Sequence, residues 1–149
     1  MGVRRTIYKS LLSSLIVVLT PFLVLVGSMA QDSSFATQAL AVDLADISWG
    51  PPGGGNGVPM GVRTARQGID PATGGVTYYA MFPAGSHFDL HWHTHDEFAV
   101  VVQGTVTIEL GEETYSLELG SYVVIPGRMN HSWDVTDGDD VVILVRRAG

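Results

Sequence analysis

Short runs of β-branched and aromatic residues dominate the second half of the chain and constrain the fold more than any other feature. Seven such runs lie between residues 76 and 147: VTYYAMF, FAVVVQ, TVTIEL, TYSLEL, SYVVI, SWDV and VVILVRR. Glycine, proline or acidic residues separate them, which is typical of strands joined by turns. No helical period of useful length follows residue 30. The pattern predicts an all-β fold, either a closed barrel or a sandwich.

The segment TVTIEL-GEE-TYSLEL predicts a hairpin within this fold. Apolar and polar residues alternate on both sides of its turn, so one face of the pair should be buried and the other solvated. The residues expected on the buried face are Val106, Ile108, Leu110, Tyr115, Leu117 and Leu119.

The N-terminus has the organisation of an export signal. A basic start, MGVRRTIYKS, precedes the uncharged apolar residues 11–27, and small residues stand at Ser28 and Ala30. Residues 1–30 are therefore predicted to be a signal peptide cleaved before Gln31. The alternative is an uncleaved membrane anchor formed by residues 11–27, although Pro21 interrupts that short segment. Either way, the domain should work outside the cytoplasm, as a periplasmic or secreted protein. RRTIYK also resembles the twin-arginine motif, so two export routes stay open.

Composition excludes several classes of partner and chemistry. After residue 30 the chain carries five arginines, no lysine and fifteen acidic residues, a formal charge of −10. This acidic part of the chain should repel nucleic acid and anionic lipids, so only the N-terminal segment is expected to contact a membrane. Cysteine is absent from all 149 residues, which excludes disulfides, thiolate metal sites and a cysteine nucleophile.

A lead-in, residues 31–61, separates the predicted signal from the predicted barrel of residues 62–149. Its last part, PPGGGNGVPMG, holds five glycines and three prolines in eleven positions. This composition excludes a helix or a central strand. We expect a surface loop here.

The segment HWHTHDEF, residues 91–98, concentrates three of the five histidines with two carboxylates. His91, His93 and Glu97 share a face on a strand, but a straight strand would separate the first from the last by about 20 Å. One metal ion can therefore bind all three only if the chain turns at residues 94–96. His95 would then lie in the turn, pointing away. Two imidazoles and one carboxylate are the usual ligands of non-heme iron sites.

The residues around this cluster resemble the first motif of the cupin family. That motif places Gly, His, His, Glu and Gly at spacings that Gly85, His91, His93, Glu97 and Gly104 match. In the second motif, Gly120, Pro126 and His131 match, whereas Arg128 stands where glycine is expected and Val135 where asparagine is expected. The resemblance covers about residues 76–145.

The resemblance implies a cupin-type jelly-roll β-barrel, also called a double-stranded β-helix, with a divalent metal inside. The implied ligands are His91, His93, Glu97 and His131, and the implied metals are Fe, Mn, Ni, Cu or Zn. Strand parity adds Gln103 and Trp133 as candidates for a substrate pocket; ordinary core packing is the alternative for Trp133. His87 is expected at the rim or on the surface.

Three function classes follow from the resemblance. The first is a metal-dependent oxidoreductase of the dioxygenase type acting on a small molecule, with Glu97 as both ligand and catalytic base. The second is a metal-dependent isomerase or carbon–carbon lyase. The third is a non-catalytic ligand-binding or sensor domain at the cell envelope. The apolar strands, together with the habit of small cupins to pair their sheets, also predict a homodimer.

Overall fold

The computed structural model describes residues 40–149, so the predicted signal peptide lies outside the described residues. Within this range the chain forms ten strands and one short 3-10 helix, η1 (Leu44–Asp46), and it contains no helix long and apolar enough to cross a membrane. The strands are β1 (Gly53–Gly55), β2 (Val58–Ile69), β3 (Val76–Phe82), β4 (His87–His91), β5 (Glu97–Gln103), β6 (Val106–Leu110), β7 (Glu113–Leu117), β8 (Tyr122–Ile125), β9 (His131–Val135) and β10 (Val141–Arg147).

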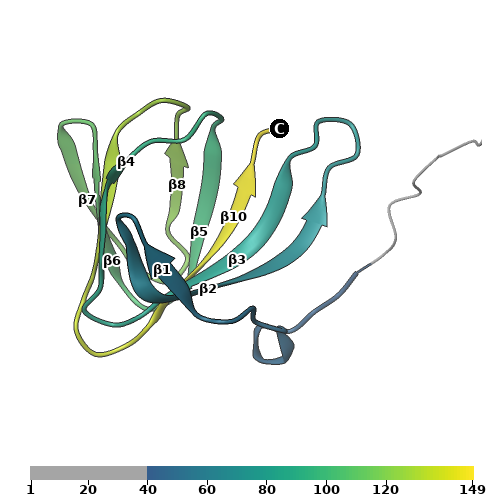
Figure 1. Ribbon diagram of the computed structural model, residues 1–149, viewed down its shortest axis with the longest axis horizontal. Helices are drawn as coiled ribbons and strands as arrows, with labels where there is room; N and C mark the ends of the chain where they lie inside the picture. The colour runs from purple at the N-terminus through teal and green to yellow at the C-terminus, as the bar shows by residue number, and fades with distance from the viewer. Residues whose placement is uncertain (1–39) are drawn as a thin grey trace, which may run out of the picture. The chain divides into compact units, whose positions relative to one another are not determined.

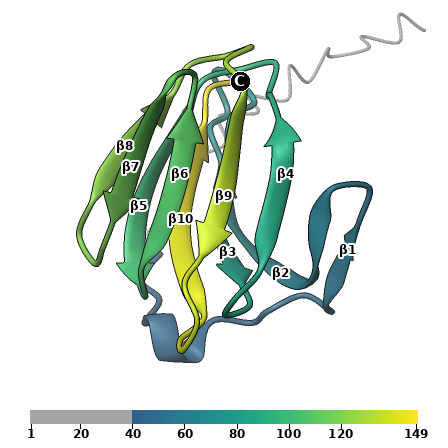
Figure 2. The ribbon, with the colours of Figure 1, turned by 90° about the vertical axis from the view of Figure 1, so that its left-hand side faces the viewer.

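Two antiparallel sheets face each other, as Figures 1 and 2 show. The larger sheet has the order β1-β2-β3-β10-β5-β8, and the smaller has the order β4-β9-β6-β7. From β3 onward the chain crosses repeatedly between the sheets, for example from β3 to β4 and back to β5. The predicted all-β class is confirmed, and the arrangement is the predicted jelly roll of the cupin type.

The core lies between the sheets and follows from the two-residue period of the strands. On β5, Ala99 and Val101 are buried, whereas Phe98 and Val100 are only partly covered because they point outward. The β6–β7 hairpin pairs Val106 with Leu117 and Ile108 with Tyr115, as its alternation predicts. Tyr115 and Leu119 are nevertheless exposed, because β7 is an edge strand and ends at Leu117.

The surface-loop prediction for residues 51–61 is only partly right. Gly53–Gly55 forms β1, which pairs with the start of β2 around a two-residue turn at Asn56 and Gly57. Both turn residues have positive φ angles, 53° and 88°, as a type I′ hairpin turn requires. The glycines can form a strand here because β1 is exposed at the edge of the sheet, where side chains need not pack.

The chain turns between His93 and Glu97, as the spacing predicts, and a second turn holds it there. Gly127 donates its main-chain N–H to Asp96 Oδ1 (2.7 Å), and Arg128 donates its main-chain N–H to the His93 carbonyl oxygen (2.7 Å). Arg128 has a φ of 66°, so it adopts the left-handed conformation that glycine would favour at this motif position. The departure from the motif therefore leaves the turn intact.

These two turns lie so close together that any side chain at position 127 should destabilise the fold. A Cβ atom on Gly127 would lie 2.9 Å from the Thr94 carbonyl oxygen, which is main chain and cannot rotate away. We expect Gly127→Ala to lower the free energy of unfolding by about 1–3 kcal/mol, measured by urea denaturation. Gly68→Ala is the matched control, because nothing lies within 4 Å of its Cβ position. Equal stability of the two variants would contradict the close-contact argument.

Candidate metal centre

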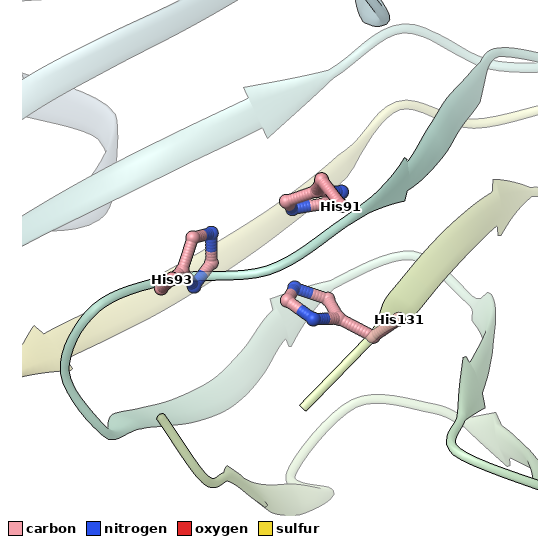
Figure 3. A group of neighbouring side chains, drawn as sticks. All are labelled: His91, His93 and His131. Atoms are coloured by element: carbon pink, nitrogen blue, oxygen red, sulfur yellow. The ribbon is translucent and has the colours of Figure 1, made fainter. Parts of the chain in front are cut away.

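Three histidines converge where β4 ends and β9 begins. His91 is the last residue of β4, His131 is the first of β9, and the two are cross-strand partners. His93 follows on the segment that leads to β5, and all three rings point toward one another (Figure 3). Each residue offers one nitrogen, and these nitrogens lie within 4.8 Å of one another. Such a group can hold a metal ion.

Hydrogen bonds to the main chain fix the orientation of two of the rings. His91 Nδ1 lies 2.7 Å from the Asp89 carbonyl oxygen, and His131 Nδ1 lies 3.1 Å from that of Met129. A carbonyl oxygen only accepts, so Nδ1 must carry the proton in both residues. Each Nε2 is then left with its lone pair, the form in which imidazole binds metals.

The nitrogens that face the centre lack a hydrogen-bond partner. His91 Nε2, His93 Nδ1 and His131 Nε2 are all buried and unpaired within the described residues. Buried polar atoms are ordinarily paired because desolvation without a partner is costly. Several unpaired lone pairs directed at one place fit a bound cation, so the residues present fit the metal that the sequence motif implies.

Burial keeps the imidazoles of His91 and His131 neutral. Desolvation lowers the pKa of His131 to about 4, partly offset by its bond to the Met129 carbonyl. Desolvation also lowers the pKa of His91. Both rings are therefore neutral near pH 7, with their single proton on Nδ1. A metal ion would not have to displace a proton from Nε2 of either ring.

Glu97, the predicted fourth ligand, lies beside His93. Its carboxylate is buried, and Oε2 is 3.0 Å from His93 Nδ1 without the alignment of a hydrogen bond. The other oxygen, Oε1, is 3.5 Å from both Tyr78 Oη and Arg147 Nε. Burial raises the pKa of Tyr78, so its hydroxyl stays protonated and can donate to Glu97. Glu97 thus contacts the histidine group through His93.

The remaining two histidines lie outside the group. His95 is exposed in the turn, as predicted. His87 is exposed on β4, where its Nδ1 is 2.6 Å from Asp134 Oδ1, and this hydrogen bond raises the pKa of His87. Neither ring can share a metal ion with His91.

The two predicted pocket residues, Trp133 and Gln103, lie in different parts of the fold. Trp133 is buried in the core and stacked on Phe82, and its ring is nearly perpendicular to that of His131, with 6.4 Å between centroids. Gln103 is exposed at the far end of β5 and donates to the Asp140 carbonyl. Parity places Gln103 on the face of Glu97, but six residues of strand separate the two by about 20 Å, so Gln103 lies apart from the histidine group and its pocket role stays a prediction.

Sequence analysis missed three residues around the centre. Phe88 stacks on the His91 ring at 3.9 Å between centroids, while Tyr78 and Arg147 contact Glu97. The aromatic pair Tyr78–Tyr79 and the arginine pair Arg146–Arg147 were visible in the sequence. Only the pairing register of the strands shows which member of each pair faces inward.

Comparison with known proteins agrees with this fold. Residues 78–145 match the family model described as the cupin domain. A segment of 56 residues is 32% identical to the Sinorhizobium fredii protein y4oW, which is described as uncharacterized. That alignment covers 38% of this chain and spans about a quarter of the relative, 25% of its length.

Solved structures resemble the chain at low sequence identity. A cupin 2 conserved barrel domain protein from Rhodopseudomonas palustris has a TM-score of 0.61 at 19% identity, over 69% of this chain and 72% of that one. An RmlC-like cupin from Ralstonia eutropha has a TM-score of 0.58 at 24% identity, over 75% and 69%. KdgF from Halomonas sp. has a TM-score of 0.57 at 22% identity, over 72% and 93%. At these identities the likeness concerns the fold alone, and it agrees with the match of residues 78–145 to the cupin domain model.

The lowered pKa of His131 predicts a dependence of stability on pH in protein freed of metal by a chelator. The unfolded histidine takes up a proton near pH 6.5, whereas the folded one does so only near 4. The unfolded state therefore binds more protons between these values, and stability should fall as the pH drops from about 6.5 to about 4. Urea unfolding across this range measures the slope. His131→Asn, which keeps a donor for the Met129 carbonyl but cannot titrate, should show a shallower fall; an unchanged slope would refute the assignment.

Proposed function

We propose that this chain is a metal-binding cupin that acts as an oxidoreductase of the dioxygenase type on a small molecule. The observation that carries the proposal is the set of three unpaired, buried imidazole nitrogens with the Glu97 carboxylate beside them. His91, His93, Glu97 and His131 would hold the metal. Such a nitrogen- and oxygen-rich set suits Fe, Mn, Ni, Cu or Zn.

The proposed reaction needs coordination positions on the metal that the protein ligands leave open. A metal held by these four donors would still have room to polarise a substrate oxygen and to bind O2. The chain's own part is to bring the substrate to that position and to move its proton. As both ligand and base, the Glu97 carboxylate would take a proton from an enol or catechol hydroxyl, because it is buried and lies beside the histidine group. Phe88 and Trp133, which are cross-strand partners next to the His91–His131 pair, would supply apolar contacts to the imidazoles.

We expect the metal to depend on the four proposed ligands. His91→Ala, His93→Ala, His131→Ala and Glu97→Ala should each weaken metal binding on the order of 100-fold or more, because each removes one donor from a buried centre. Metal per chain after dialysis and the thermal midpoint measure this loss. The matched controls His87→Ala and His95→Ala should retain wild-type metal content. Loss of metal in His95→Ala but not in His91→Ala would overturn the ligand assignment.

Oxygen uptake by the metal-loaded wild-type protein with enols and catechols tests the reaction class in the same samples. Uptake that disappears in His91→Ala supports the dioxygenase proposal. Conversion of a compound without oxygen uptake would instead favour an isomerase or lyase. Tight binding without any conversion would favour a ligand-binding or sensor role.

We also propose that the protein is exported and forms a homodimer. The basic start, the apolar segment 11–27 and the small residues before Gln31 support export. The outer face of the six-stranded sheet supports pairing with a second copy. It carries a depression of about 420 Å³ lined mainly by apolar side chains: Thr77, Phe98, Val100, Tyr122, Leu144 and Arg146. Tyr122 at its rim is 60% exposed, so a second sheet could cover this surface.

Mass measurements on protein recovered from outside the cytoplasm test both proposals. Mass spectrometry should find a chain that begins at Gln31, and light scattering at micromolar concentration should give twice the monomer mass. Tyr122→Asp should shift the scattering mass toward the monomer, because it places a charge on the apolar surface. An intact residue 1–30 segment would favour a membrane anchor, and a monomeric wild type would reject the dimer.

A further inference from the structure

The two oxygens of the Glu97 carboxylate have different neighbours. Oε2 faces His93, whereas Oε1 has two donors near it, the Tyr78 hydroxyl and the Arg147 guanidinium, each at 3.5 Å. Those donors come from two other strands, β3 and the end of β10. The carboxylate is therefore contacted from both ends.

Strand register puts all three side chains on the inner face of the six-stranded sheet. Glu97 and Arg147 are cross-strand partners on β5 and β10, and Tyr78 is the partner of Val145, one inward-facing position earlier on β10. Their sequence neighbours face the other way. Arg146 lines the outer depression, and its guanidinium lies 3.6 Å from Asp70 instead.

An unconstrained glutamate would not present a fixed oxygen to the centre. Its terminal torsion is broad and nearly two-fold, so either oxygen could face the histidines, or both could do so together. Donors at Oε1 select one orientation and leave only Oε2 free. Arg147 also supplies the opposite charge that a carboxylate with 7% side-chain exposure requires.

We infer that Tyr78 and Arg147 are positioning residues that hold Glu97 for metal binding through Oε2 alone. This inference rests on the metal site proposed above. Partners that orient a ligand in this way typically affect metal affinity by 10- to 100-fold. Tyr78 and Arg147 would act through Glu97 and would not themselves contact the metal.

Affinity for Co²⁺, measured by competition with a chelator, tests the inference. Tyr78→Phe and Arg147→Met should each weaken Co²⁺ binding by about 10- to 100-fold, because Oε1 loses a donor and the carboxylate can turn. The controls Tyr79→Phe and Arg146→Met alter the adjacent residue of the same type on the outer face, and they should bind Co²⁺ like the wild type.

A double-substitution comparison separates positioning from a general loss of structure. In a Glu97→Ala background both carboxylate oxygens are gone, so adding Tyr78→Phe should weaken Co²⁺ binding no further. If Tyr78 had only a structural effect, Tyr78→Phe would lower the Co²⁺ affinity of the double variant by as much as it lowers that of the wild type. This result would overturn the inference. So would wild-type affinity in both Tyr78→Phe and Arg147→Met. If the wild-type protein itself bound no Co²⁺, the proposed metal site would fail and the inference with it, whereas tight wild-type binding with unaffected variants would reject the inference alone.

Discussion

Arg128 donates its main-chain N–H to the His93 carbonyl oxygen, and Gly127 donates its own to Asp96. These two bonds join the segment that carries His93 to the segment that leads into His131. Without them, His93 would sit on a free turn, and the histidine group would depend on side-chain packing alone. Ala148 adds a third bond, from its N–H to the Asp96 carbonyl oxygen, so the end of β10 also holds this turn. The geometry of the centre is thus set by main-chain N–H donors, two of which have main-chain acceptors, whereas the Gly127 N–H depends on the Asp96 side chain.

Strand periodicity made most of the fold and part of the centre predictable from the sequence. The seven predicted runs all became strands, and the turn before Glu97 followed from the reach of a straight strand. That argument also removed His95 from the candidates. It could not place His131, which is far from the first cluster in sequence and becomes a neighbour of His91 only through β4–β9 pairing. Gln103 lies apart from the histidine group for a related reason, since strand parity defines which face a residue is on and not its position along the strand.

The electrostatics of the centre differ from those of the whole chain. The chain is strongly acidic, yet the centre holds one carboxylate, with Arg147 beside it, and the uncharged imidazoles of His91 and His131. A divalent cation would therefore meet lone pairs that are not protonated and a carboxylate that is already oriented. The acidic surface adds a favourable long-range field for cations, which weakens with ionic strength.

β10 lies between β3 and β5, and neither of those strands pairs with the other. The larger sheet therefore cannot close during synthesis until residues 141–147 are available, although all the proposed metal ligands precede them. Assembly of the centre should be a late event that waits for nearly the whole domain, because Arg147 and the Ala148 bond both reach the Glu97 segment from the last strand. A partly made chain would present the histidines without the closed sheet, so selective capture of a metal ion at the proposed site would become possible only once the barrel has closed.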